Sequence, residues 1–357
     1  MNYVGVDLHK ERSWFYVTDE TGNKRDSKSI SNQPDELKKY FSSIPRPFSL
    51  AVEATYNCYF FMDIANMYTD KAYLANSYEL KAFAKRHKKT DKIDARLIAD
   101  VLRKGYLPIV TMPDEATRKI RAILRYRMNL VADRTRNITS LKAFLDKIGE
   151  DSTGNFATHK RLGELKYYHL AVEYQKVISG YIKRIDDLTS HIAETERFLK
   201  ERASNDEDIV NLITMPGLDY FSAALIKSEI IDINRFSCFE KLCAYAGLAP
   251  RVSQSAHKSI HGPLCSNRRK HLQWILLEVV WHFIRKQPDK LSKYDAISKR
   301  KNANTAKVAI ARDMLKVIYH ILKEKRPFFR KEQIRSVAAP ALVVQQDTLL
   351  GRGLKRP

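Results

Sequence analysis

The chain has 357 residues, with 63 lysines and arginines against 41 aspartates and glutamates, so its formal net charge is +22. Its hydrophobic content of 44% suits buried cores in two or more domains and excludes a disordered basic tail. No apolar stretch reaches the roughly 18 residues of a membrane span, and no signal peptide precedes the first strand pattern, so we expect a cytoplasmic protein. A large positive surplus favours a polyanionic partner, and nucleic acid is the leading candidate.

The first part of the chain, residues 1–110, alternates strand and helix patterns. Three strands are expected as a series of hairpins, and strand–helix pairs follow them. In the first strand, Val4 and Val6 point to one face, while Gly5 and Asp7 point to the other. Hairpins followed by strand–helix pairs predict a mixed sheet with helices on both faces, which is an α/β nuclease-like architecture.

Four acidic residues of this part are candidates for chemistry. Asp7 and Glu53 each end an apolar strand, where the ordinary interpretation is a solvent-exposed position. Asp91 and Asp94 share a face at the start of a helix capped by Thr90, where they also suit the positive end of the helix dipole. A helical projection places both acids on the apolar side, where carboxylates are costly unless they are paired or bind metal. Four such acids match the oxygen ligands of Mg²⁺ or Mn²⁺ ions that assist phosphoryl transfer.

The middle of the chain, residues 111–204, changes to long helices. Apolar residues recur at steps of three and four along two stretches, which is the pattern of a coiled-coil seam. The first seam contains Leu124, Met128, Val131, Ile138, Leu141, Leu145 and Ile148, and the second contains Ile178, Tyr181, Ile185, Leu188, Ile192, Thr195 and Leu199. Glycines between the seams predict an antiparallel helical hairpin, which is either a spacer or a surface that assembles copies of the chain.

The third part, residues 205–330, is predicted to be mainly helical, and residues 331–357 form an unassigned tail. Between two helical patterns lies a turn containing Gly217, which resembles a helix-hairpin-helix turn. Backbone N–H groups of such turns contact DNA phosphates, and a plain interhelical turn is an equal alternative. Only the segment 253–266 is expected to be irregular.

This irregular segment combines hydroxyl groups with a basic setting. Most serines in loops only bond backbone or water, so it is the basic surroundings that make this segment, with Ser253, Ser255 and Ser259, a candidate for a nucleophile, and a loop that only binds phosphate is the alternative. Cations beside a hydroxyl can hold a phosphate and stabilise the charge that develops during attack. The candidate phosphate-binding cations are Arg251, Lys258, Arg268, Arg269 and Lys270.

These motifs together resemble the DEDD transposases of the IS110 insertion-sequence family, and they are similar to the Piv-type DNA invertases. The resemblance runs in chain order from residue 3 to about residue 326. Its motifs are Tyr3–Lys10, Glu53–Thr55, Lys89–Ala95, Pro216–Leu218, Gly247–Arg251 and Ser255–Lys258.

The resemblance implies a RuvC-like (RNase H-like) metal domain at 1–110, a coiled-coil middle at 111–204, and a C-terminal transposase domain with a serine nucleophile at 205–330. The family's acidic tetrad matches Asp7, Glu53, Asp91 and Asp94, and its serine matches Ser255. The family commonly has Ser-Gly-Gly-Lys where this chain has Ser-Ala-His-Lys, which leaves Ser253 as a rival.

The resemblance further implies that DNA is cut and rejoined through a covalent phosphoserine link in a metal-dependent reaction. A structured non-coding RNA would guide the reaction, and a homo-oligomer, dimer or tetramer, would perform it in the bacterial or archaeal cytosol near the nucleoid. Two other classes stay open. A RuvC-like structure-specific nuclease would need only the carboxylates and water, and a non-enzymatic nucleic-acid binder would need neither metal nor serine.

Overall fold

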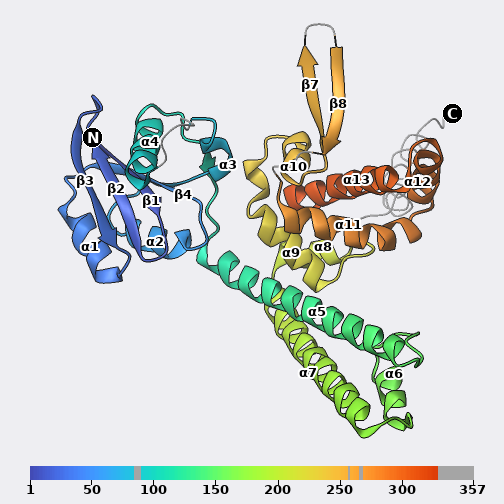
Figure 1. Ribbon diagram of the computed structural model, residues 1–357. Coiled ribbons are helices and arrows are strands. Elements are labelled where there is room, and N and C mark those ends of the chain that lie inside the picture. Colours follow the sequence, from blue (N-terminus) through green and yellow to red (C-terminus); the bar gives the residue numbers. More distant parts are fainter. Residues whose placement is uncertain (84–89, 256–257, 265–267, 329–357) are drawn as a thin grey trace, which may run out of the picture. The chain divides into compact units, whose positions relative to one another are not determined.

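The computed structural model describes residues 1–83, 90–255, 258–264 and 268–328 (Figure 1). The chain divides into two compact units, Met1–Asp114 and Glu115–Pro357. Within the described ranges, none of the helices combines the length and the apolar character that crossing a membrane requires.

The first unit is built on a six-stranded sheet with the strand order β3-β2-β1-β4-β5-β6. Its strands are β1 (Asn2–Leu8), β2 (Arg12–Thr18), β3 (Lys24–Ser31), β4 (Phe48–Glu53), β5 (Ala72–Ala75) and β6 (Ile109–Val110). The first three strands pair antiparallel, β1, β4 and β5 pair parallel, and β6 closes the edge antiparallel. The predicted mixed sheet, beginning with hairpins, is confirmed.

Helices cover both faces of this sheet. The helices of the unit are α1 (Pro34–Ser43), α2 (Cys58–Ala65), α3 (Ser77–Leu80) and α4 (Asp91–Arg103). The core under α1 and α2 contains Val4 and Val6 of β1 together with Phe41 and Phe61, whose ring centroids are 5.6 Å apart. Ala51 of β4 lies instead in the cluster under α4, so successive strand residues alternate between the two cores as predicted.

The close packing of β1 against α4 depends on Gly5. A Cβ atom added to Gly5 would lie 2.1 Å from the carbonyl oxygen of Ala95 and 2.4 Å from the backbone nitrogen of Ala99. Ala95 and Ala99 are fully buried, so the helix backbone lies directly on the strand. This contact sets how near the start of α4 comes to the end of β1.

The second unit is largely helical. Its elements are α5 (Glu115–Lys147), α6 (His159–Glu164), η1 (Leu165–Tyr167), α7 (Val172–Ala203), α8 (Glu207–Ile213), α9 (Tyr220–Ile230), η2 (Ile233–Arg235), α10 (Phe239–Tyr245), β7 (Pro250–Ser255), β8 (Lys258–Leu264), α11 (Lys270–Arg285), α12 (Pro288–Arg300) and α13 (Ala303–Glu324). Helices α5 and α7 run side by side as an antiparallel pair (Figure 1). Leu141 and Leu145 of the first predicted seam share a buried cluster with Ile178 and Ile185 of the second.

The other end of the α5–α7 pair joins the main core of the second unit. Leu124 and Leu199 are buried in the same cluster as Leu225, Leu276 and Ile318 from α9, α11 and α13. The long helices and the following helices therefore share one core, and the boundary proposed at residue 204 stays a prediction.

The segment 253–266 was expected to be irregular, and this expectation was wrong for its described part. β7 pairs antiparallel with β8 as a hairpin (Figure 1). The residues from Arg251 to Ser255 include a single large apolar residue, Val252, so no apolar alternation marked the strand in the sequence.

Candidate active site

Asp7 and Glu53 come to the same edge of the sheet because their strands are parallel neighbours. Val6 of β1 pairs with Val52 of β4, and each acid is the next residue along its strand. Glu53 lies two residues beyond Ala51 and Asp7 two residues beyond Gly5, so both acids belong to the face that α4 covers.

Asp91 and Asp94 stand in the first turn of α4. Thr90 caps this helix, since its side-chain oxygen accepts a hydrogen bond from the backbone N–H of Ile93 at 3.3 Å. Asp94 is half-buried, whereas the side chain of Asp91 is 58% exposed. The expectation that both acids face the apolar side was therefore wrong for Asp91, because the buried face of α4 begins only at Ala95.

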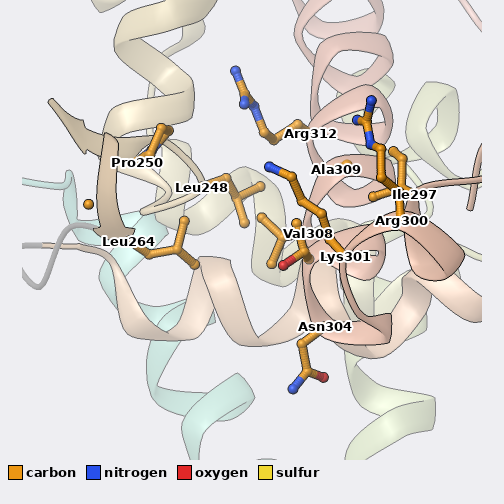
Figure 2. A pocket seen from close by; sticks show the side chains of 12 residues that line it. Leu248, Pro250, Leu264, Ile297, Arg300, Lys301, Asn304, Val308, Ala309 and Arg312 are labelled. Carbon is orange, nitrogen blue, oxygen red and sulfur yellow. The ribbon is translucent and has the colours of Figure 1, made fainter. Parts of the chain in front are cut away.

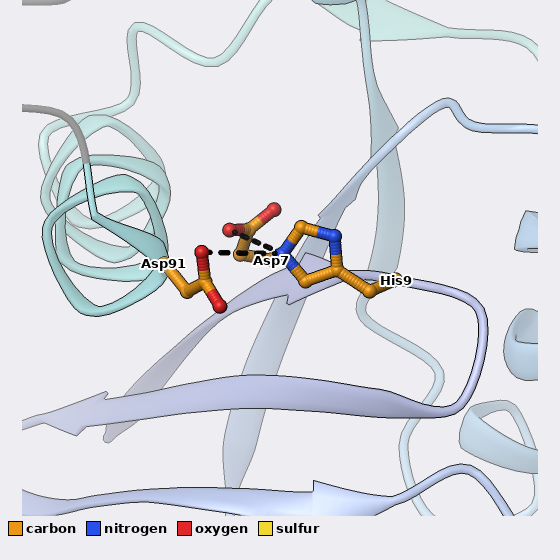
Figure 3. A group of neighbouring side chains, drawn as sticks. All are labelled: Asp7, His9 and Asp91. Carbon is orange, nitrogen blue, oxygen red and sulfur yellow. Dashed lines mark ion pairs between the residues drawn. The ribbon is translucent and has the colours of Figure 1, made fainter.

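His9, one residue after β1, contacts two of the predicted acids. Its Nε2 lies 3.2 Å from Oδ2 of Asp7 and 3.4 Å from Oδ1 of Asp91, and Figure 3 shows both carboxylates directed toward the Nε2 edge of the ring. One ligand atom from each of the three residues lies within 4.8 Å of the others. The side-chain amides of Asn32 and Asn57 each donate to the carbonyl oxygen of His9 at 2.8 Å, which fixes the loop.

The four predicted acids act on one another electrostatically. Burial raises the pKa of Asp7, His9 opposes this effect, and the carboxylates of Asp91, Asp94 and Glu53 raise it further. The structure brings ligand atoms of Asp7 and Asp91 together with His9, whereas Glu53 and Asp94 influence the Asp7 carboxyl without belonging to that group of ligand atoms. Clustered carboxylates repel one another until a cation neutralises them. Carboxylate oxygens together with one imidazole nitrogen are suitable ligands for Mn²⁺, and the carboxylate oxygens alone suit Mg²⁺.

Sequence reasoning assigned His9 no role, although it stands in the first motif. The signal that was available is its spacing, because a residue two positions after a strand-end acid can fold back over that acid. Imidazole is a common metal ligand, so a histidine at this spacing was a candidate.

The predicted nucleophile lies on the hairpin of the second unit. Ser255 of β7 is paired with Lys258 of β8, and Ser253 is paired with Ile260. The residues between the strands, Ala256 and His257, lie outside the described part of the chain. The structure describes only the backbone of Arg251, Ser253, Ser255 and Lys258, so their roles stay predictions.

The other predicted phosphate-binding cations differ in their surroundings. The Nε atom of Arg269 donates to the hydroxyl of Tyr245 at 2.7 Å and lies 3.5 Å from the buried carboxylate of Glu229, so this guanidinium is engaged inside the protein. The side chain of Arg268 packs over Gly247. Lys270, the first residue of α11, is exposed.

Gly217 packs the turn between α8 and α9 onto α11. Its φ angle is +96°, and an added Cβ atom would lie 3.0 Å from Cβ of His282 and 3.1 Å from the backbone nitrogen of Phe283. Both the turn conformation and this contact require glycine at the position. The packing explains the glycine without DNA, and a phosphate contact there stays a prediction.

Comparison with known proteins defines the class of this chain. One family model, described as a transposase and built on DEDD transposases of the IS110 type, matches residues 4–150 and so includes all four acids. A second, described as transposase of the IS116/IS110/IS902 family, matches residues 210–295 and includes the β7–β8 hairpin. The chain is thus a transposase, an enzyme that recombines DNA. It belongs to the IS110/IS116 family of insertion-sequence transposases.

Individual relatives agree with this assignment. The transposase for insertion sequence element IS1328 of Yersinia enterocolitica is 25% identical over 276 residues, which are 77% of this chain and 81% of the relative. The transposase for element IS1111A of Coxiella burnetii is 24% identical over 266 residues, covering 71% and 72% of the two chains. An uncharacterized 44.8 kDa protein of element IS116 from Streptomyces clavuligerus is 24% identical over 296 residues, covering 67% and 72%.

Proposed function

We propose that this transposase cuts and rejoins DNA with a divalent-metal site at Asp7, Glu53, Asp91 and Asp94 and with Ser255 as the nucleophile. The observation that supports the proposal is the arrangement around Asp7: Glu53 ends the neighbouring parallel strand, and Asp91 in the first turn of α4 shares His9 with Asp7. The strand order β3-β2-β1-β4-β5, with β2 antiparallel to both neighbours, supports an RNase H-like (RuvC-like) fold for the first unit.

Asp7, His9 and Asp91 fit a divalent ion by their chemistry and their spacing, and Glu53 and Asp94 would add carboxylate oxygens of the same kind. Mg²⁺ or Mn²⁺ bound there would polarise a DNA phosphate and neutralise the negative charge of the transition state. The chain prepares the site by burying Asp7 and by holding His9 between Asp7 and Asp91. Two asparagine amides on the carbonyl of His9 keep that arrangement in place.

In the proposed reaction, the Oγ atom of Ser255 forms a bond to a DNA phosphorus, and one bridging DNA oxygen leaves. The serine proton passes to solvent, and the leaving oxygen becomes a hydroxyl. Attack by a hydroxyl of another DNA end on the phosphoserine reverses the step and rejoins a strand. Arg251 and Lys258 would stabilise the charge on the phosphate oxygens, and Ser253 is the alternative nucleophile.

We further propose a structured guide RNA and a homo-oligomer, dimer or tetramer, as partners. The net charge of +22 suits more than one polyanion, and base pairing by an RNA would determine the target without a side-chain code. The α5–α7 pair offers a long helical surface for assembly.

The test is incubation of the full chain with DNA of the element's ends, its RNA and Mg²⁺, followed by denaturing separation. We expect a covalent protein–DNA adduct with the wild type and with Ser253→Ala, and none with Ser255→Ala, with Asp94→Ala or in EDTA. An adduct that persists in Ser255→Ala overturns the serine assignment. Cleavage that needs Asp94 but survives Ser255→Ala would make the protein a structure-specific nuclease instead.

A further inference from the structure

A pocket of about 650 Å³ lies at the base of the β7–β8 hairpin (Figure 2). Pro250 and Leu264, which pair across the hairpin, form one wall together with Gly262. The opposite wall comes from the end of α12 and the first turns of α13. The volume lies within the range of roughly 300–1,000 Å³ that is typical of sites enclosing small organic groups.

The pocket is strongly cationic. Arg300, Lys301 and Arg312 line it, and among the described residues of its lining none is acidic. Asp313, next to Arg312 in the chain, is bound by two lysines of α12 at 3.0 and 2.8 Å and does not neutralise the pocket. Burial raises the pKa of the Cys243 thiol, which contacts Arg312, so that thiol stays neutral and leaves the arginine its full charge.

The rest of the lining is mainly apolar. Leu248, Leu264, Ile297, Val308 and Ala309 provide hydrocarbon surface. Figure 2 shows the side chains of Arg300, Lys301 and Arg312 together with these apolar groups around the pocket. A free phosphate would use only the cations, and an apolar peptide would leave them without partners. A ligand that combines a flat, weakly polar ring with an anionic group uses both.

We infer that this pocket receives one unpaired nucleotide of a DNA strand, with the base against the apolar surface and the phosphate on Arg300, Lys301 and Arg312. Enzymes that modify a DNA base extrude its nucleotide into a pocket in this way, which shows that a protein pocket can hold an unpaired nucleotide. The inference rests on the proposed function for the identity of the ligand. Cations and an apolar wall of matching size are what a nucleotide requires.

The position of the pocket relates the bound nucleotide to the site of cutting. Ser255 lies five residues along β7 from Pro250, which corresponds to roughly 16 Å of extended strand. That length equals about five base steps of B-form DNA. For a DNA strand that follows β7, the held nucleotide would lie a few positions from the phosphate that Ser255 would attack, where it would fix the register of the strand.

The experiment measures binding without reaction. Full-length protein carrying Ser255→Ala, in EDTA, is titrated with a fluorescent oligothymidylate of about 12 nucleotides and with an abasic strand of the same length. Ala309→Trp fills the pocket without changing charge. We expect it to weaken oligothymidylate binding about tenfold while abasic binding changes less than about twofold. Retained abasic binding shows that the variant is folded.

A charge-matched pair of variants tests how the cations bind phosphate. Arg300→Ala/Lys301→Ala removes two charges from the pocket, whereas Arg285→Ala/Lys286→Ala removes two exposed charges of the same unit that do not line it. The first pair is expected to weaken both strands and to lower the salt slope by about 0.7 for each phosphate that is no longer neutralised. The Arg285→Ala/Lys286→Ala variant is expected to keep most of the wild-type affinity for both strands.

Two results would overturn the inference. One is wild-type affinity of Ala309→Trp for oligothymidylate, and the other is an equal loss of affinity in the two charge variants. Neither result depends on metal or on the serine hydroxyl. The experiment therefore distinguishes a wrong assignment of the nucleotide pocket from a wrong assignment of the reaction. Loss of the covalent adduct with normal oligothymidylate binding would instead count against the reaction.

Discussion

Gly5 sets the separation of β1 and α4, and with it the separation of Asp7 from the acids of α4. Gly5→Ala would place a methyl group 2.1 Å from the carbonyl oxygen of Ala95, so backbone must move. We expect the free energy of unfolding to fall by about 1–3 kcal/mol in a urea titration, and the affinity for Mn²⁺ to fall as well.

A matched glycine controls for the substitution itself. Gly180 lies inside α7, and apart from its chain neighbours and the backbone of its own helix no described atom lies within 4 Å of an added Cβ. Gly180→Ala should raise stability by roughly 0.5–1 kcal/mol, because alanine is the better helix former. Wild-type stability and metal affinity in Gly5→Ala would show that the strand and helix do not need this close packing.

At Asp7, the proposed metal binding and the stability of the metal-free fold make opposite demands on the carboxylate. Burial and three neighbouring carboxylates raise its pKa in the folded chain, so between the unfolded value near 4 and the folded value the native state holds more protons than the unfolded state. Stability from this residue is therefore lost as the pH rises through that interval. Without metal, Asp7→Asn should be more stable than the wild type at pH 7.

A divalent ion should reverse that order. An ion that binds only the folded wild type, present at a concentration 100 times its dissociation constant, adds about 2.7 kcal/mol to the free energy of unfolding. The Asp7→Asn variant should gain much less. Thermal unfolding with and without Mn²⁺ at pH 7 measures both effects. A wild type that gains no stability from Mg²⁺ or Mn²⁺ at any concentration would argue against a metal site.

At the scale of elements, local periodicity was enough to predict the leading hairpins, the alternation along β1 and the two helical seams. These patterns depend only on residues that are close in the chain, and in these segments the secondary-structure propensity and the pattern of apolar residues favour the same element. The contact of His9 with Asp91 and the exposure of Asp91 could not be predicted, because they depend on where α4 lies on the sheet. The β7–β8 hairpin could not be predicted, because its strands pair through their backbones and their sequences do not alternate between apolar and polar residues.

Helix α5 is joined to α9 by a buried charge network. Arg121, whose side chain is 2% exposed, donates from Nε and Nη2 to the carbonyl oxygen of Ser228 at 3.0 and 2.6 Å. It also lies 3.6 Å from Glu229, which is equally buried. Without Arg121, the carbonyl oxygen of Ser228 loses two charge-assisted hydrogen bonds, and the buried carboxylate of Glu229 is left with the two more exposed arginines, Arg125 and Arg269.

Two arginines of α5 should therefore respond differently to the same substitution. Arg121→Met is expected to lower the free energy of unfolding by about 3–5 kcal/mol. Arg125→Met should cost less than about 1 kcal/mol, because Arg125 is 48% exposed and 3.7 Å from the same carboxylate. Chemical denaturation of both variants measures the difference. Similar decreases in the free energy of unfolding would show that the burial of Arg121 does not increase its contribution to stability.

At the scale of the whole molecule, the residues proposed for metal binding and for nucleophilic attack belong to different compact units. The acids belong to Met1–Asp114, and the hairpin with Ser255 belongs to Glu115–Pro357. In the proposed reaction, the metal held by the acids and the hydroxyl of Ser255 act on the same DNA phosphate. An oligomer allows the acidic site of one protomer to work with the serine of its partner, which is the arrangement that a mixing experiment can detect.

Asp94→Ala and Ser255→Ala proteins are each expected to form no adduct alone. Mixed and allowed to exchange subunits, they should recover activity, because the intact acids of one protomer can meet the intact serine of the other. Random exchange in a two-fold dimer would restore about a quarter of the wild-type sites. Mixing Asp94→Ala with Asp7→Asn is the control, since neither protein contributes intact acids. A first mixture as inactive as this control would mean that each chain uses its own acids and its own serine.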